Sequence, residues 1–128
     1  MNAFKPENSI LKFMNDVIST ESLVDMCYRI DKRIEDIYSG YFDDINKSEE
    51  ENTKCYINEI RYLRDEIEDN STNLNDTSTK EKLRSTLNKV TICLDEMKHR
   101  RKELGCGMVD YDDIVDSYKN EAIFDLLG

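Results

Sequence analysis

Few residues of this chain have side chains that could carry out catalysis. The one histidine, His99, stands between Lys98 and Arg100, where neighbouring positive charge disfavours an imidazolium. Cys93 lies on a different helical face from His99, so we do not expect a cysteine–histidine pair. Glycine-rich phosphate loops, nucleophile elbows and dinucleotide-binding fingerprints do not occur in the sequence. The sequence therefore predicts a protein that is not an enzyme.

The same residues give little support to a metal site. Glu96 and His99 have the spacing of the carboxylate–histidine motif of di-iron four-helix bundles, but such sites need a second histidine, which the chain lacks. A zinc site would have to combine His99 with Cys55, Cys93 and Cys106, without the short CxxC pairs that are typical of zinc motifs. We therefore expect neither a metal nor another cofactor.

The four cysteines are Cys27, Cys55, Cys93 and Cys106, and in a cytoplasmic protein they are most simply reduced thiols. The first three fall on or beside apolar helical faces, where cysteine usually serves as a small buried hydrophobe. Cys106 stands between two glycines and is the thiol that we expect to be exposed.

The charge balance restricts the partners of the protein. The 128 residues include 28 acidic and 18 basic side chains, which gives a formal net charge of −10. Such a field repels phosphate backbones and anionic lipid headgroups, so we expect neither a nucleic-acid partner nor a membrane. The first residues lack the unbroken apolar core of a signal peptide, and no apolar run approaches the ~20 residues of a membrane span. We expect a cytoplasmic protein, with the nucleus as an alternative.

The pattern of apolar residues predicts an all-α fold. One proline and four glycines leave most of the chain without the residues that punctuate β-hairpins. We expect residues 1–128 to form a single domain, an antiparallel bundle of four to five helices. The expected helical stripes cover residues 10–18, 23–45, 49–67, 78–104 and 114–127. Hydroxyl residues between Ser19 and Ser22 separate the first two stripes and predict a break between two helices. Within the second stripe, Gly40 makes a kink or an early end of the helix an alternative.

Local signals also place the ends of two helices. Ser48 with Glu51, and Ser78 with Glu81, have the spacing of a capping box, in which each side chain bonds a backbone N–H at the other position. Gly105 follows the long helix that begins at Ser78 and suits its C-terminal cap. The expected helix over residues 49–67 is followed by a polar stretch, residues 69–77, that is typical of a loop.

Two arginines of the helix over residues 49–67 have acidic residues four positions later. The pairs are Arg61 with Asp65 and Arg64 with Glu68, and this spacing predicts ion pairs on the outer face of the helix.

One positive block interrupts the acidic chain, and it consists of Lys98, Arg100, Arg101 and Lys102. These cations suit the C-terminus of the long helix, and the reversal at residues 105–107 would return Asp110, Asp112 and Asp113 to their neighbourhood. We therefore expect neutralisation within the molecule. Contact with RNA phosphates or a nuclear import signal is the alternative use of this cluster.

The C-terminal segment combines acidic and apolar residues. We predict that its partner-binding residues are Tyr118, Ile123, Phe124, Leu126 and Leu127. Such a segment docks in a groove of another protein, or packs into the core of its own bundle, which is the commoner arrangement.

These observations predict a non-enzymatic protein–protein interaction module. It would serve as a small acidic adaptor, complex subunit, inhibitor or effector that binds a protein partner, with a basic surface, through an apolar groove with tyrosines or through its acidic surface. The stripes that begin near Leu23 and Ser78 are long enough for a homo-oligomer as well. The alternative function is a ribosome- or RNA-associated factor that uses the basic cluster Lys98 to Lys102.

Overall fold

The computed structural model describes residues 19–40, 43–105 and 111–128. These residues form four α-helices, which are α2 (Ser19–Ser39), α3 (Glu49–Asp69), α4 (Thr77–Glu103) and α5 (Tyr111–Leu126). The described part of the chain contains no strand, so the predicted all-α fold is confirmed. The additional helix predicted over residues 10–18 lies outside the described residues.

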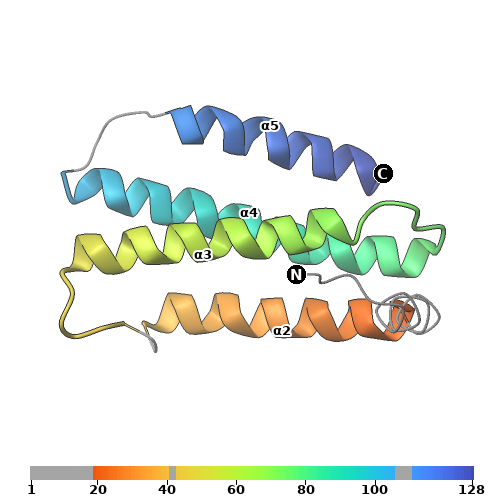
Figure 1. The fold of residues 1–128 in the computed structure, drawn as a ribbon, viewed down its shortest axis with the longest axis horizontal. Helices are drawn as coiled ribbons and strands as arrows, with labels where there is room; N and C mark the ends of the chain where they lie inside the picture. The colour runs from red at the N-terminus through yellow and green to blue at the C-terminus, as the bar shows by residue number, and fades with distance from the viewer. Residues whose placement is uncertain (1–18, 41–42, 106–110) are drawn as a thin grey trace, which may run out of the picture.

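The described helices lie lengthwise beside one another in a bundle (Figure 1). α4 packs extensively against both α2 and α3, whereas α2 and α3 approach each other less closely. α5 lies on the far side of α3 and α4 from α2 (Figure 1), and its backbone approaches α4 at few positions. α4 is therefore the central helix of the bundle, packed closely against α2 and α3, while α5 is attached to it more loosely.

α4 supplies the central stripe of the core. Leu83, Leu87, Val90, Leu94 and Met97 recur three or four residues apart, and all are buried, as their spacing predicts. The buried apolar side chains that α2 and α3 contribute are Leu23, Met26, Cys27, Ile30, Ile34, Ile37, Tyr56, Ile57, Ile60, Leu63 and Ile67. Burial of one large aliphatic side chain contributes about 1.5–3 kcal/mol relative to exposure, so this core is the main source of stability.

The N-terminal cap of α3 is as predicted, but that of α4 is not. Ser48 accepts a hydrogen bond from Glu51 N at 3.1 Å, and the Glu51 side chain bonds the Ser48 N–H, which completes the capping box. For α4 the predicted Ser78 capping box is wrong, because the N-cap is Asp76, whose carboxylate accepts from the N–H groups of Ser78 and Thr79. An ionised carboxylate makes stronger hydrogen bonds to free N–H groups than a hydroxyl does, so the helix begins at the earlier residue.

α2 differs from the prediction at both ends. Its described part begins at Ser19, so residues 19–22, where we predicted a break, are helical. It ends at Ser39, where Gly40 takes a left-handed conformation with φ +70°, so the predicted alternative of an early end is confirmed. Ile45, which we assigned to the stripe of this helix, lies beyond that end and is 95% exposed.

The cysteine predictions are partly confirmed. Cys27 and Cys93 are buried free thiols, and burial raises the pKa of both, that of Cys93 to about 11. Cys55 is exposed, so its predicted burial is wrong: it precedes the buried Tyr56 but lies on the solvent side of α3. Cys106 lies outside the described residues.

Candidate protein-binding surface

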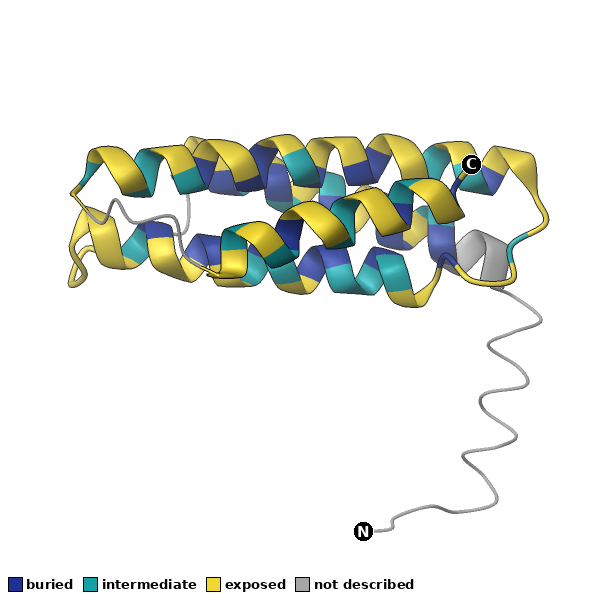
Figure 2. Ribbon diagram, turned by 90° about the horizontal axis from the view of Figure 1, so that it is seen from above, coloured by how far each residue is buried: buried dark blue, intermediate teal, exposed yellow. Residues whose placement is uncertain are grey.

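α5 has two different faces, and only one of them is used in the bundle. Its inner face carries Asp116, Ile123 and Leu127, which are buried and share one side of the helix. Five apolar residues follow each other at three- or four-residue spacing on the other side, and we call them the α5 outer face: Tyr111, Ile114, Tyr118, Ala122 and Leu126. All five are exposed, and the four large ones have exposed fractions of 77, 52, 70 and 45% in chain order. Figure 2 looks down on this helix, which ends near the label C, and much of its ribbon is in the exposed colour.

The predicted partner-binding residues divide between these two faces. Tyr118 and Leu126 belong to the outer face, whereas Ile123 and Leu127 are in the hydrophobic core and Phe124 packs against that core while partly buried. The sequence prediction had combined both sides of the helix into one surface.

The sequence prediction also missed Tyr111 and Ile114, which begin the outer face. Their signal is the three- or four-residue spacing that continues backwards from Tyr118.

An ionic cluster attaches the inner face to the bundle. The Asp116 carboxylate lies 2.6 Å from Arg64 Nη1, 3.1 Å from Arg61 Nη2 and 3.4 Å from Lys98 Nζ. Burial alone would raise the pKa of Asp116, but hydrogen bonds from Arg64 and Arg61, and their charges, lower it overall. Arg64 and Asp116 are each only 2% exposed, so this is a buried ion pair between α3 and α5.

This cluster corrects the prediction that Arg61 and Arg64 form ion pairs on an outer face of α3. Both guanidinium groups point to Asp116 instead, because α5 covers that side of α3. Asp65, the predicted partner of Arg61, receives the ammonium of Lys119 at 3.1 Å. Each of these contacts joins α5 to α3, and none was visible from spacing within a single helix.

Acidic side chains border the α5 outer face. Glu121 and Asp125 are exposed and follow Tyr118 at three and seven residues, which places them beside the apolar stripe. Within the described part of the chain, neither carboxylate has an ion-pair partner. Asp112, near the start of the helix, is also largely exposed and only 4.0 Å from an Arg61 nitrogen. The outer face is therefore an apolar stripe with a negative border.

Two cations of the basic cluster have acidic partners. Lys98 lies 3.5 Å from the predicted neighbour Asp113, as well as near Asp116. Arg100 pairs at 2.6 Å with Glu49, in the first turn of α3, which the sequence prediction did not foresee. Arg101 is half-buried and Lys102 is exposed.

The acidic residues predicted to surround this cluster are distributed differently. Asp112 is near Arg61 rather than near the cluster, and Asp110 lies outside the described residues.

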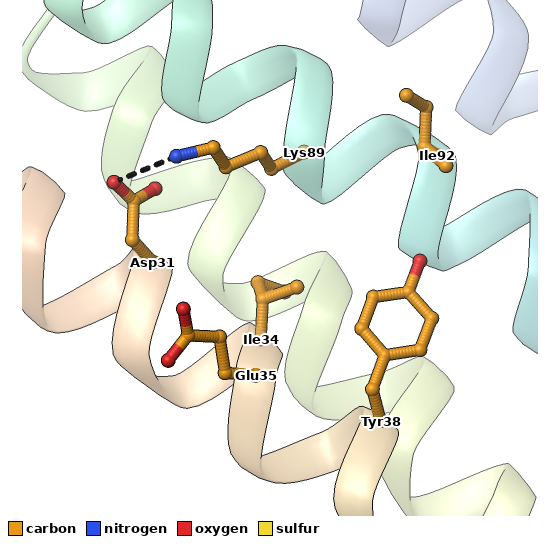
Figure 3. A pocket seen from close by; sticks show the side chains of 6 residues that line it. All are labelled: Asp31, Ile34, Glu35, Tyr38, Lys89 and Ile92. Atoms are coloured by element: carbon orange, nitrogen blue, oxygen red, sulfur yellow. Dashed lines mark hydrogen bonds and ion pairs between the residues drawn. The ribbon is translucent and has the colours of Figure 1, made fainter.

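A pocket of about 270 Å³ lies between α2 and α4, away from α5. Its lining residues are Asp31, Ile34, Glu35, Tyr38, Lys89 and Ile92 (Figure 3). Ile34 is buried at its base, while Tyr38 and Ile92 are about half exposed at its sides. Its lining combines two isoleucine side chains and one tyrosine ring with three charged side chains.

Other classes of site are not seen in the described residues. There, no group of three or more His, Cys, Asp or Glu side chains is arranged to hold a metal ion. None of the four helices combines the length and the apolar character that a membrane crossing requires. His99 pairs with Glu103 at 3.2 Å on the surface of α4, and this pair is exposed.

Comparison of the chain with protein-family models finds no match, and comparisons with curated proteins and with solved structures also find none.

Proposed function

We propose that this protein is a non-enzymatic interaction module, an acidic antiparallel helical bundle that binds a partner protein through the α5 outer face. The observation that carries the proposal is that α5 leaves an apolar stripe exposed although its opposite face already attaches it to the bundle. Core packing accounts for Ile123 and Leu127 but not for Tyr111, Ile114 and Tyr118. Contiguous exposed apolar surface with a polar border is typical of protein interaction sites.

Ion pairs support the antiparallel arrangement in this proposal. Arg29 of α2 pairs with Glu66 of α3 at 3.1 Å, and Arg33 of α2 pairs with Glu59 of α3. The residue number rises along one helix while it falls along the other, which is the order expected for antiparallel neighbours. Short connections between consecutive helices favour the same arrangement.

The partner we propose presents an amphipathic helix with apolar residues at three- or four-residue spacing and lysines or arginines beside them. The apolar residues would cover the α5 outer face, and the cations would meet Glu121 and Asp125. A second copy of this chain fits less well, because two outer faces would bring these unpaired carboxylates together on a chain with a net charge of −10. The net charge of −10 favours a basic partner protein, which we place in the cytoplasm or the nucleus.

The alternative, a ribosome- or RNA-associated factor, needs cations that are available to phosphates. Lys98 and Arg100 are engaged with Asp113 and Glu49, so two of the four cations of the basic cluster already have acidic partners. We therefore favour the protein partner.

A pair of matched variants tests the proposal. Tyr118, on the α5 outer face, and Tyr62, on α3, have exposed fractions of 70 and 69%, so replacing either by serine removes a similarly exposed ring. A fluorescently labelled helical peptide with leucines at three- or four-residue spacing and flanking lysines is titrated with each protein, and anisotropy gives the affinity. We expect Tyr118→Ser to weaken binding about tenfold and Tyr62→Ser to leave it unchanged.

Three controls make this test decisive. A peptide of the same apolar pattern with glutamates in place of the lysines should bind at least about tenfold more weakly. Proteins captured from the source cell by the wild type should be lost with Tyr118→Ser and kept with Tyr62→Ser. Equal effects of the two tyrosine variants, or dimers in light scattering that dissociate on Tyr118→Ser, would overturn the proposal of a basic partner at this face.

A further inference from the structure

The pocket between α2 and α4 has a chemical character that differs from that of the α5 outer face. Its base and sides are apolar, formed by Ile34, Ile92 and the ring of Tyr38, and its border carries charged groups (Figure 3). Tyr38 and Ile92 remain about half exposed around the hollow, so their surfaces are available for a group that enters it.

The charges at this border are unevenly matched. Asp31 has two cations, Lys82 and Lys89, whose Nζ atoms are each 3.1 Å from its Oδ2. Glu35 is exposed on the next turn of α2, and within the described residues no ion pair reaches its carboxylate. The other oxygen of Asp31, Oδ1, is buried and accepts no hydrogen bond from any described group. The border therefore has one exposed carboxylate, Glu35, to which an additional cation can bind, while Asp31 is already matched by its two lysines.

The phenol ring of Tyr38 gives the pocket a face that attracts cations. Burial and a hydrogen bond to Glu96 raise the pKa of Tyr38, so the ring stays neutral and its face keeps the negative potential that binds a cation. The same pair of helices already uses this interaction within the molecule, because Lys82 Nζ lies 4.5 Å from the centre of the Tyr28 ring. At Tyr38 the lining cation, Lys89, points to Asp31 instead (Figure 3).

We propose that this pocket binds the side chain of an arginine from a basic protein partner. The aliphatic part of arginine would lie against Ile34 and Ile92, and its planar guanidinium would stack on Tyr38 and donate hydrogen bonds to Glu35. A purely apolar side chain would leave the Glu35 carboxylate without a counter-charge, whereas Asp31 already has Lys82 and Lys89. This inference concerns a different face from the α5 outer face and holds whether or not that face binds a helix.

The experiment titrates the full-length protein with N-acetyl-arginine methylamide and follows the methyl NMR signals of Ile34 and Ile92. The matched probe is the citrulline analogue, which has the same shape but carries no charge. We expect saturable shifts at both isoleucines with the arginine probe and about tenfold weaker binding of the citrulline probe. Equal binding of the two probes, or no saturable shift at these isoleucines, would overturn the inference.

Variants connect the binding to named side chains and separate it from the proposed function. Tyr38→Leu removes the ring and Glu35→Gln removes the charge, and each should weaken the arginine probe about fivefold or more while the helical circular dichroism is kept. Tyr62→Leu is the exposed control and should change nothing. Tyr118→Ser should also leave arginine binding unchanged, so failure at this pocket is distinguishable from failure at the α5 outer face. Loss of probe binding with Tyr118→Ser, or full binding with Tyr38→Leu, would contradict the assignment.

Discussion

Replacement of Asp116 by alanine should destabilise the protein by about 3–5 kcal/mol, because it removes the shared counter-charge of a buried cluster. Three cations surround this carboxylate, at 2.6 Å for Arg64, 3.1 Å for Arg61 and 3.4 Å for Lys98. After the substitution the Arg64 guanidinium, which is 2% exposed, keeps Asp65 at 3.7 Å as its one anionic neighbour within the described residues. A buried charge without a close counter-charge costs far more than an exposed pair, which contributes about 0–1 kcal/mol.

Urea unfolding followed by circular dichroism measures this loss, which is a large part of the roughly 5–15 kcal/mol that stabilises a domain of this kind. Asp125→Ala is the control, because Asp125 is exposed on the same helix, and its effect should stay within about 0.5 kcal/mol. The double variant Asp116→Leu with Arg64→Met should be more stable than Asp116→Ala, since it also removes the most deeply buried of the three cations and leaves only the more exposed Arg61 and Lys98 without this carboxylate. A loss below about 1 kcal/mol for Asp116→Ala, or a double variant that is no more stable than it, would refute this reasoning.

Three further predictions follow from the structure. The pKa of Asp116 is lower in the folded state than in the unfolded state. The ionised carboxylate therefore stabilises the fold above roughly pH 4, and this stabilisation is lost as the pH falls through the folded-state pKa. Unfolding free energies measured between about pH 6 and pH 2 should fall more steeply for the wild type than for Asp116→Asn. Asp76→Ala should lower the free energy of unfolding by about 1 kcal/mol because it removes the N-cap of α4, whereas Ser78→Ala should lower it by only about a few tenths of a kcal/mol. Equal urea midpoints for the two variants would contradict the assigned cap. Cys55 is exposed and Cys93 is buried, so in the folded protein only the first of these two thiols should react fast with a thiol reagent. Cys55→Ser should therefore remove one fast-reacting thiol, whereas Cys93→Ser should leave the number of fast-reacting thiols unchanged. A fast phase that Cys55→Ser does not change would show that the Cys55 thiol is shielded.

The sequence was sufficient to predict those parts of the fold that depend on local periodicity. The stripe from Leu83 to Met97 in α4 is buried as its spacing indicates, and the capping box at Ser48 forms because both of its partners lie within one helical turn. The cap of α4 was mispredicted because Asp76 and Ser78 are both good capping residues close together. Choosing between them requires the relative strength of their hydrogen bonds, which a pattern of residue types does not contain.

The candidate surface was only partly predictable because it depends on which helices meet. The spacing of Arg61 and Arg64 from later acidic residues favours local pairs, whereas in the structure α5 brings Asp116 to both. Periodicity identified the apolar residues of the C-terminal helix but not the side on which each lies in the bundle. Tyr118 and Ile123 were therefore assigned to one surface although they occupy opposite sides of α5.

The ionic attachment of α5 has a consequence for the uniqueness of the fold. This helix is apolar on two sides, so hydrophobic burial by itself would tolerate a half-turn of α5 about its own axis that hides Tyr111 and Tyr118 and displays Ile123. Burial of apolar area has no direction, whereas a carboxylate that must meet Arg61, Arg64 and Lys98 together permits one rotation and one axial position. Asp116 thus favours the observed rotation of α5, in which the stripe with Ile123 is buried and the stripe with Tyr118 is exposed.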